Sequence, residues 1–388
     1  MRLRGRVTVL GCVLVAVSLL ATALVALIVV AAVPDRLALV LSVIAASVPA
    51  LVYAAIVLRL DRYEIEPVRA LVACFAWGAI GAVLLSLAGG LLFQIGVENL
   101  FGYPTAAVAS VVLGAPLVEE TAKGIAVLGV LRLARHELDD TLDGLVYGAL
   151  VGVGFAMTEN ILYFGQSYLQ GGIGDLGELF VARAVLGGFG HPAYTAVTGA
   201  AIGWARGRYG RGFARVAVPF LGWVVAVALH AAWNGGLVYA QFSRDDEVSL
   251  LQAVAVQAAV VIVPAVLVLY AVARLSARHE LQILRDQLRD EVANGVLTTT
   301  EYETIIDGAA RQRALAAARE RGGRSLRARQ QAFFHTAAEL AFRGHHRDRG
   351  ETLTVRQLAA DEVDRQRLIA LREQIAGNVS ALEAQSPS

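Results

Sequence analysis

Eight apolar runs, each long enough to cross a lipid bilayer, dominate the first 274 residues of the chain. They cover residues 8–33, 37–58, 71–95, 105–131, 142–164, 179–204, 216–239 and 249–273. About 20 apolar residues in a helix span the hydrocarbon layer, and lipid offers no partner to an unpaired backbone group, so such runs fold as membrane-crossing helices. The sequence therefore predicts an all-α, polytopic bundle of about eight transmembrane helices in the cell membrane.

The distribution of arginine predicts how this bundle is oriented. If the N-terminus is cytoplasmic, twelve arginines fall in segments on the cytoplasmic side, and only Arg36 and Arg244 fall on the other side. Short cytoplasmic segments carry the excess of basic residues in membrane proteins. We therefore expect both termini to be cytoplasmic.

Composition divides the chain into two parts. It is 56% hydrophobic and 17% charged, less charged than the roughly 25% of soluble domains, yet the residues after 274 are polar and charge-dense. We predict a transmembrane bundle at 1–274 and a cytoplasmic tail of amphipathic helices at 275–388, a candidate docking region for a cytosolic protein. The net charge of +1 gives no support to a nucleic-acid partner.

Local signals predict where helices of the tail begin and end. Asn294-Gly295 indicates a helix end, and the segment from Thr298 to Glu301 has the pattern of a capped helix start. His345-His346 lies beside arginines and is expected to be a solvated patch rather than a metal site.

The run at 105–131 departs most strongly from the apolar pattern. Glu119, Glu120 and Lys123 lie near its centre, and Lys123 is the only lysine of the chain. On a helix, Lys123 lies one turn from both acids. Ionisable groups are costly at that depth, by about 2.5–3.5 kcal/mol each on the most lenient scale, so they indicate a functional site.

Three other runs contribute polar groups at comparable depths. They are Glu159 with Asn160, His191, and His230 with Asn234. Counting about 1.5 Å per residue from the membrane boundary places them in the middle or outer half of the bilayer, so we expect all of them to face one cavity. Adjacent carboxylates there provide a base beside an acid, which suits activation of water. Histidine and amide donors suit a developing oxyanion. The pattern predicts hydrolysis of an amide within the membrane.

At these residues the sequence resembles the PrsW family of intramembrane proteases and, more distantly, the CAAX-processing and bacteriocin-immunity superfamily. The resemblance covers roughly residues 35–240. Its motifs are Asp61-Arg62-Tyr63-Glu64-Ile65-Glu66-Pro67, Glu119-Glu120-x-x-Lys123, Phe155-x-x-x-Glu159-Asn160, His191-Pro192-x-Tyr194 and His230-x-x-Trp233-Asn234.

The resemblance implies roles for the polar residues and a class of substrate. Glu119 and Glu120 would activate water, His230 and Asn234 would form the oxyanion site, and we count Lys123 and Asn160 as supporting residues. The implied substrate is a single-span, membrane-anchored regulator such as an anti-sigma factor, cut to start a bacterial stress response.

One departure from the wider superfamily leaves part of the mechanism open. CAAX-type members have a histidine four residues after the phenylalanine, where this chain has Glu159. The partner of the water is therefore open between Glu159 and His191, and prenyl-protein processing is disfavoured.

Two further questions stay open at this point. Glu120, His191 and His230 would suit Zn²⁺, whereas the charge of Lys123 opposes a bound cation, so a metal-free glutamate mechanism is favoured. A proton-coupled transporter or channel is the alternative from another class, since intramembrane Glu and His also relay protons. A third interpretation is a non-catalytic membrane scaffold.

Overall fold

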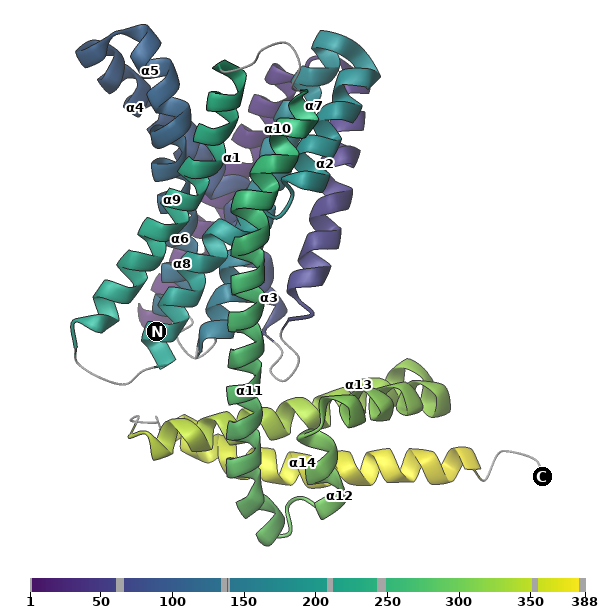
Figure 1. The fold of residues 1–388 in the computed structure, drawn as a ribbon. Coiled ribbons are helices and arrows are strands. Elements are labelled where there is room, and N and C mark those ends of the chain that lie inside the picture. Colours follow the sequence, from purple (N-terminus) through teal and green to yellow (C-terminus); the bar gives the residue numbers. More distant parts are fainter. Residues whose placement is uncertain are drawn as a thin grey trace. The chain divides into compact units, whose positions relative to one another are not determined.

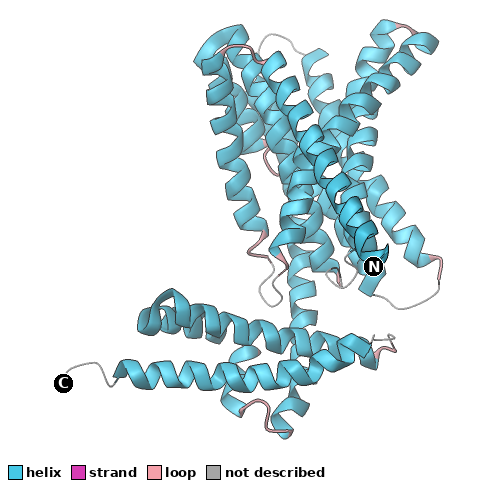
Figure 2. Cartoon of the chain, turned by 180° about the vertical axis from the view of Figure 1, so that it is seen from behind, coloured by secondary structure: helices cyan, strands magenta, loops and turns pink. Residues whose placement is uncertain are grey.

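The structure is a computed structural model, and every regular element in its described ranges is a helix (Figures 1 and 2). It describes residues 2–60, 66–133, 138, 140–207, 212–242, 249–350 and 355–383. The chain divides into two compact units, one extending to Ala273 and one that begins at Arg274.

The first unit contains most of the helices, and four of its segments, labelled η, are π-helical. Its N-terminal part consists of α1 (Arg2–Ala32), α2 (Arg36–Val57), α3 (Val68–Ala76), η1 (Trp77–Ala82), α4 (Val83–Phe101), α5 (Tyr103–Ala109), η2 (Ser110–Gly114) and α6 (Ala115–Leu133). The remainder consists of α7 (Thr141–Phe180), η3 (Val181–Leu186), α8 (Gly190–Gly207), α9 (Ala214–Phe242), α10 (Leu250–Gln257), η4 (Ala258–Ile262) and the first part of α11 (Val263–Ala293).

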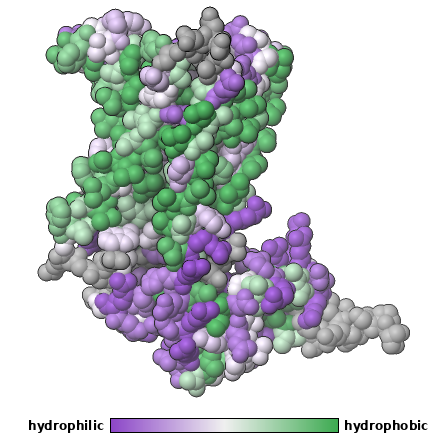
Figure 3. All heavy atoms as spheres, viewed as in Figure 1, coloured by the Kyte–Doolittle hydropathy of each residue, from purple (hydrophilic) through white to green (hydrophobic). Residues whose placement is uncertain are grey.

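Six helical stretches in the described ranges are long and apolar enough to cross a membrane. They are Val15–Ala32, Arg36–Val57, Val68–Phe101, Thr141–Gly207, Ala214–Phe242 and Leu250–Ala293. Hydrophobic residues cover most of the face of this unit seen in Figure 3. The predicted run at 105–131 is helical in α5, η2 and α6 but is not one of the six. The predicted runs at 142–164 and 179–204 fall together in the stretch Thr141–Gly207.

Glycines bring α7 and α8 into close, antiparallel contact. A Cβ atom at Gly144 would lie 2.1 Å from the carbonyl oxygen of Gly199, and one at Gly152 would lie 2.4 Å from that of His191. Gly154, two residues later, faces the backbone of Phe75 on α3 in the same way. The small residues of this run allow the two helices to pack closely. These glycines also set the position of His191 along the axis of α7.

The segment predicted as one span at 179–204 is interrupted. Its first part is η3, the chain turns at residues 187–189, and α8 begins at Gly190. Gly187 and Gly188 favour a turn here, and Pro192 fits the first turn of the helix that follows because its missing N–H needs no partner there. As a result His191 lies in the first turn of α8. The preceding helix, α7, also continues past the predicted end at 164 to Phe180, with a kink at Gly172, whose φ is +72°.

The second unit has its own hydrophobic core. It comprises the part of α11 after Arg274 with α12 (Thr299–Ile305), α13 (Gly308–Asp348) and α14 (Val355–Glu383). α11 ends at Ala293, just before the predicted stop, and Gly295 has a φ of +76°. Thr298 and Glu301 form the predicted capping box at the start of α12. Both local predictions are confirmed. The core of the unit includes the buried side chains of Leu284, Leu288, Leu297, Ile305, Phe333, Phe334 and Leu368.

Candidate active site

A buried lysine lies at the centre of the charged cluster in the first unit. The Lys123 ammonium on α6 lies 3.1 Å from Oε2 of Glu119, 2.9 Å from Oε1 of Glu120 and 2.9 Å from Nδ1 of His191. Its fourth neighbour is the ring of Phe155 on α7, whose centroid is 3.8 Å away. Lys123 is fully buried, so the ammonium is stabilised by these groups rather than by water.

The contacts of His191 define how its protons are arranged. A lysine ammonium can only donate, so Nδ1 of His191 accepts from Lys123 and Nε2 carries the proton. Nε2 lies 2.8 Å from Oε2 of Glu159 and donates to it. The sequence left Glu159 and His191 as alternative partners of the water; the structure joins them in one hydrogen-bonded pair.

Arg183 extends this network and was not among the residues predicted from the sequence. It lies on η3, donates from Nη2 to Glu159 at 2.6 Å and from Nε to Asn160 at 2.8 Å, and stacks over the ring of Tyr163. An arginine inside the otherwise apolar run at 179–204 was a signal that could have identified it, because charges at that depth indicate function. Asn160, predicted as a supporting residue, holds this guanidinium.

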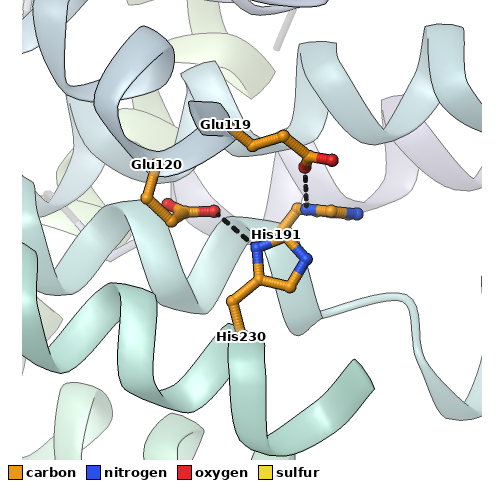
Figure 4. A group of neighbouring side chains, drawn as sticks. All are labelled: Glu119, Glu120, His191 and His230. Atoms are coloured by element: carbon orange, nitrogen blue, oxygen red, sulfur yellow. Dashed lines mark hydrogen bonds and ion pairs between the residues drawn. The ribbon is translucent and has the colours of Figure 1, made fainter. Parts of the chain in front are cut away.

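The two adjacent glutamates have different surroundings. Glu120 is fully buried, and both of its oxygens have partners: Lys123 and Nδ1 of His230 at Oε1, and the Thr195 hydroxyl, 2.9 Å away, at Oε2. Glu119 contacts Lys123 through Oε2 and lies on the wall of a cavity. Figure 4 shows the two carboxylates beside His191 and His230, where the Glu120–His230 contact is 3.1 Å and the Glu119–His191 contact is 3.9 Å. Glu120 is therefore held in place by its partners, whereas Glu119 is the carboxylate that faces the cavity.

The cavity has a volume of about 830 Å³ and is lined by residues of α4, η2, α6, α7, η3, α8, α9 and α10. The structure thus brings five of the six predicted catalytic residues to its wall: Glu119, Glu159, His191, His230 and Asn234. Glu120 lies directly behind, bonded to His230. The Asn234 amide donates to the carbonyl oxygen of Val111 at 2.9 Å, which leaves one of its two N–H hydrogens for a ligand.

The same residues include a donor set that suits a metal ion. One ligand atom each from Glu119, Glu120, His191 and His230 lie within 4.8 Å of one another. Two carboxylates and two imidazoles are ordinary ligands of Zn²⁺, which binds them at about 2.0–2.2 Å. The set would have to contract slightly, and the Lys123 ammonium, which now contacts three of the four residues, would have to move aside. Bound there, a metal would acidify a water molecule.

Comparisons with known proteins identify sequences similar to this chain. A family model described as "PrsW family intramembrane metalloprotease" matches residues 66–273, more than half of the chain. "Protease PrsW" of Geobacillus kaustophilus (strain HTA426) is 30% identical over 146 residues, covering 38% of this chain and 58% of that protein. "Protease PrsW" of Clostridioides difficile (strain 630) is 35% identical over 103 residues, covering 26% of this chain and 42% of that protein.

The matches span about half the length of these curated relatives. No solved structure matches the chain. The family match includes the segments that hold Glu119, Glu120, Glu159, His191 and His230, and it ends at the residue where the first unit ends. The chain belongs to the PrsW family of intramembrane metalloproteases, a family of multi-pass membrane proteins.

Proposed function

We propose that this protein hydrolyses a peptide bond of a single-span, membrane-anchored protein, an anti-sigma factor being one candidate, and that Glu119 activates the water. The observation that supports this best is the contrast between the glutamates. Glu120 has donors at both oxygens, whereas Glu119 lies on the cavity wall beside an ammonium and two imidazoles.

The charges of the cluster suit a proton acceptor. Three carboxylates, Glu119, Glu120 and Glu159, face one ammonium and one guanidinium, so the cluster has a formal charge of −1 with both histidines neutral. Glu120 and Glu159 are engaged by Lys123, Thr195, His191 and Arg183, so the excess negative charge is most accessible at Glu119. A carboxylate held in that position can accept a proton from water as its oxygen attacks a carbonyl carbon.

The remaining steps use groups on the same wall. As the water oxygen bonds to the carbonyl carbon, negative charge develops on the carbonyl oxygen, and Asn234 is the proposed donor to it. A neutral His230 has one N–H, which Nδ1 directs at Glu120, so His230 would join Asn234 as a donor only when Nε2 also carries a proton. When the carbon–nitrogen bond breaks, the proton held by Glu119 moves to the leaving nitrogen. His191 and Glu159 are then positioning residues, because His191 holds the Lys123 ammonium and Glu159 holds His191.

A metal ion is compatible with this wall, and its presence is a separate question. If Zn²⁺ is bound, we assign it to Glu120, His191 and His230 with Glu119 beside it, and it would supply Lewis-acid activation of the water. Zinc measured in the purified protein, and the effect of a chelator on cleavage, decide between this arrangement and a metal-free glutamate mechanism, which the position of Lys123 favours.

We also propose that the chain crosses the membrane eight times, with both termini and the whole tail at 275–388 in the cytoplasm. The antiparallel contact of α7 with α8, and the continuous helical character of 103–133, support counting each of these segments as a crossing. Reporter fusions after each helix test it. A reporter at the C-terminus that is active only outside the cytoplasm would contradict it.

The decisive experiment compares the wild type with the Glu119→Gln, Glu120→Gln double variant. Single-span proteins that accumulate intact in cells with the inactive variant identify candidate substrates, and one of them is then incubated with each purified protein in detergent. We expect cleavage by the wild type and a loss of at least about 10³-fold in the variant. Full cleavage by the variant would exclude a glutamate-based protease. Proton-coupled transport without cleavage would favour the transporter interpretation.

A further inference from the structure

Three buried hydroxyl groups on the cavity wall have no hydrogen-bond partner in the described part of the chain. They belong to Ser86 on α4, Ser110 on η2 and Tyr194 on α8. Leaving a buried hydroxyl unpaired is unfavourable, and folded proteins rarely do so. Three such groups from three different elements, all at one cavity, indicate a ligand that supplies their partners.

Tyr194 is the most rigidly placed of the three. Its side chain is 1% exposed, and its ring stacks on that of His230 with centroids 5.1 Å apart and planes at 22°. The ring of His191 lies edge-on at 6.2 Å. Its hydroxyl lies beside Gly190, where a Cβ atom would approach it to 3.2 Å. The phenol is therefore a fixed donor next to the histidines of the charged cluster.

The chemistry of these groups favours the main chain of a peptide as the ligand. A transmembrane helix must unwind before one of its peptide bonds can be attacked, which leaves backbone N–H and C=O groups without partners in a medium of low dielectric constant. A hydroxyl both donates and accepts, so it can pair with either group. The apolar residues Leu87, Leu91 and Val238 on the same wall suit the side chains of such a segment.

We propose that Ser86, Ser110 and Tyr194 bind the main-chain peptide groups of an unwound membrane-protein segment, with Tyr194 donating to the carbonyl oxygen that becomes the oxyanion. This rests on the proposed function. When water adds to the carbonyl carbon, the π electron pair moves to that oxygen and the hydrogen bond from Tyr194 strengthens, while the phenol keeps its proton. Collapse of the intermediate restores the carbonyl and breaks the carbon–nitrogen bond.

The test is Tyr194→Phe, which removes only the hydroxyl, assayed with the single-span protein found by accumulation. Loss of one oxyanion donor should lower kcat by about 10²–10³-fold with little change in KM. The melting temperature in the same detergent should stay equal or rise, because an unpaired buried group is removed. Ser86→Ala and Ser110→Ala should raise KM by about two- to tenfold, with kcat near that of the wild type.

Two other residues provide matched controls. Thr198 has a buried, unpaired hydroxyl that does not line the cavity, so Thr198→Val should preserve both cleavage and melting temperature. Tyr147 is as buried as Tyr194, but its hydroxyl donates to Glu66. Tyr147→Phe should therefore lower the melting temperature while the folded protein cleaves at the wild-type rate.

Two outcomes would overturn the assignment of Tyr194. One is cleavage by Tyr194→Phe within threefold of the wild-type kcat. The other is a fall in its melting temperature like that of Tyr147→Phe, which would show a structural role. If the wild type cleaves none of the candidate substrates, the proposed function is wrong and this inference falls with it. That result differs from the loss of cleavage in a single variant, which tests only the inference.

Discussion

In the second unit arginines pair with carboxylates as forks, whereas in the first unit one lysine is shared among several acceptors. Arg365 binds both oxygens of Glu291, with Nη2 2.7 Å from Oε1 and Nε 2.9 Å from Oε2. Arg372 likewise binds both oxygens of Glu301, with Nε 2.7 Å from Oε1 and Nη2 2.6 Å from Oε2. In pairs of this kind the planar guanidinium matches the carboxylate, and both charges are satisfied.

Lys123 offers the opposite arrangement. A compact ammonium lies between Glu119, Glu120 and His191, and its three N–H donors face one acceptor on each of them. An arginine guanidinium would hold one carboxylate in one geometry. The lysine ammonium is compact, so it can stabilise whichever neighbouring group carries the negative charge as a proton moves between them. The comparison shows how one chain uses the same classes of charge for stability in one unit and, by our proposal, for chemistry in the other.

The largest effect should follow from replacing Lys123. Lys123→Met leaves two buried carboxylates without their cation, so we expect cleavage to fall by about 10³-fold or more and the melting temperature to drop sharply. Lys123→Arg keeps the charge but brings a larger fork, and should lose at least about 10²-fold in rate with less effect on folding. Cleavage rate per folded molecule and melting temperature measure both.

Zinc content of the same variants distinguishes the two mechanisms. If a metal ion displaces the ammonium, Lys123→Met should bind more zinc than the wild type and retain cleavage that a chelator removes. Cleavage by Lys123→Met without zinc would contradict the assigned role of the lysine.

Arg183 should have the next largest effect. It holds Glu159 and Asn160 on the far side of His191, so Arg183→Gln should lower kcat by about 10–100-fold through misplacement of that pair, with KM changed less. Arg183→Lys should recover part of the loss. Arg132→Gln, at an exposed arginine near the end of α6, is the control and should cleave normally. Equal rates for Arg183→Gln and the control would remove Arg183 from the site.

In the second unit a broken fork should change stability but not cleavage. Glu291 is 6% exposed, so Arg365→Gln leaves a buried carboxylate without its cation and should lower the free energy of unfolding of this unit by about 2 kcal/mol. Arg313→Gln breaks an exposed pair with Asp307 at 3.8 Å and should change it by less than about 0.5 kcal/mol. Denaturant unfolding measures both variants. If Arg365→Gln also lowered the cleavage rate, this ion pair of the second unit would contribute to cleavage as well as to stability.

Much of this arrangement could be predicted from the sequence because the signals are local or periodic. Long apolar runs indicate helices, an Asn-Gly pair after α11 indicates a stop, and an i, i+4 or i, i+3 spacing places Lys123 against Glu119 and Glu120. The four-residue spacing of Gly144, Gly148 and Gly152 in α7 is a local signal of the same kind, because it places small residues on one helix face, and the close packing there sets His191 opposite Gly152.

Other features depend on contacts between distant segments and could not be read in this way. The difference between Glu119 and Glu120 arises because His230 and Thr195, more than 70 residues away, approach only one of them. Arg183 reaches Glu159 because the helix α7 is broken between them at Gly172, whose φ is +72°, instead of continuing straight. Similarly, His345 and His346 were expected to be solvated, but both are half-buried on α13, where the ring of His345 lies 6.1 Å from that of His279.

This correction leads to the smallest predicted effect, a sensitivity of the second unit to mild acid. Burial, together with Arg349, His346 and His279 and against the opposing charge of Asp348, lowers the pKa of His345 from 6.5 to about 4. Between pH 4 and pH 6.5 the unfolded chain binds a proton at His345 that the folded unit does not bind. The free energy of unfolding is therefore unaffected by His345 above pH 6.5 and decreases as the pH falls towards 4. His345→Gln should therefore lose less melting temperature between pH 7 and pH 5 than the wild type. Equal losses in His345→Gln and the wild type would mean that His345 is protonated as readily in the folded unit as in the unfolded chain.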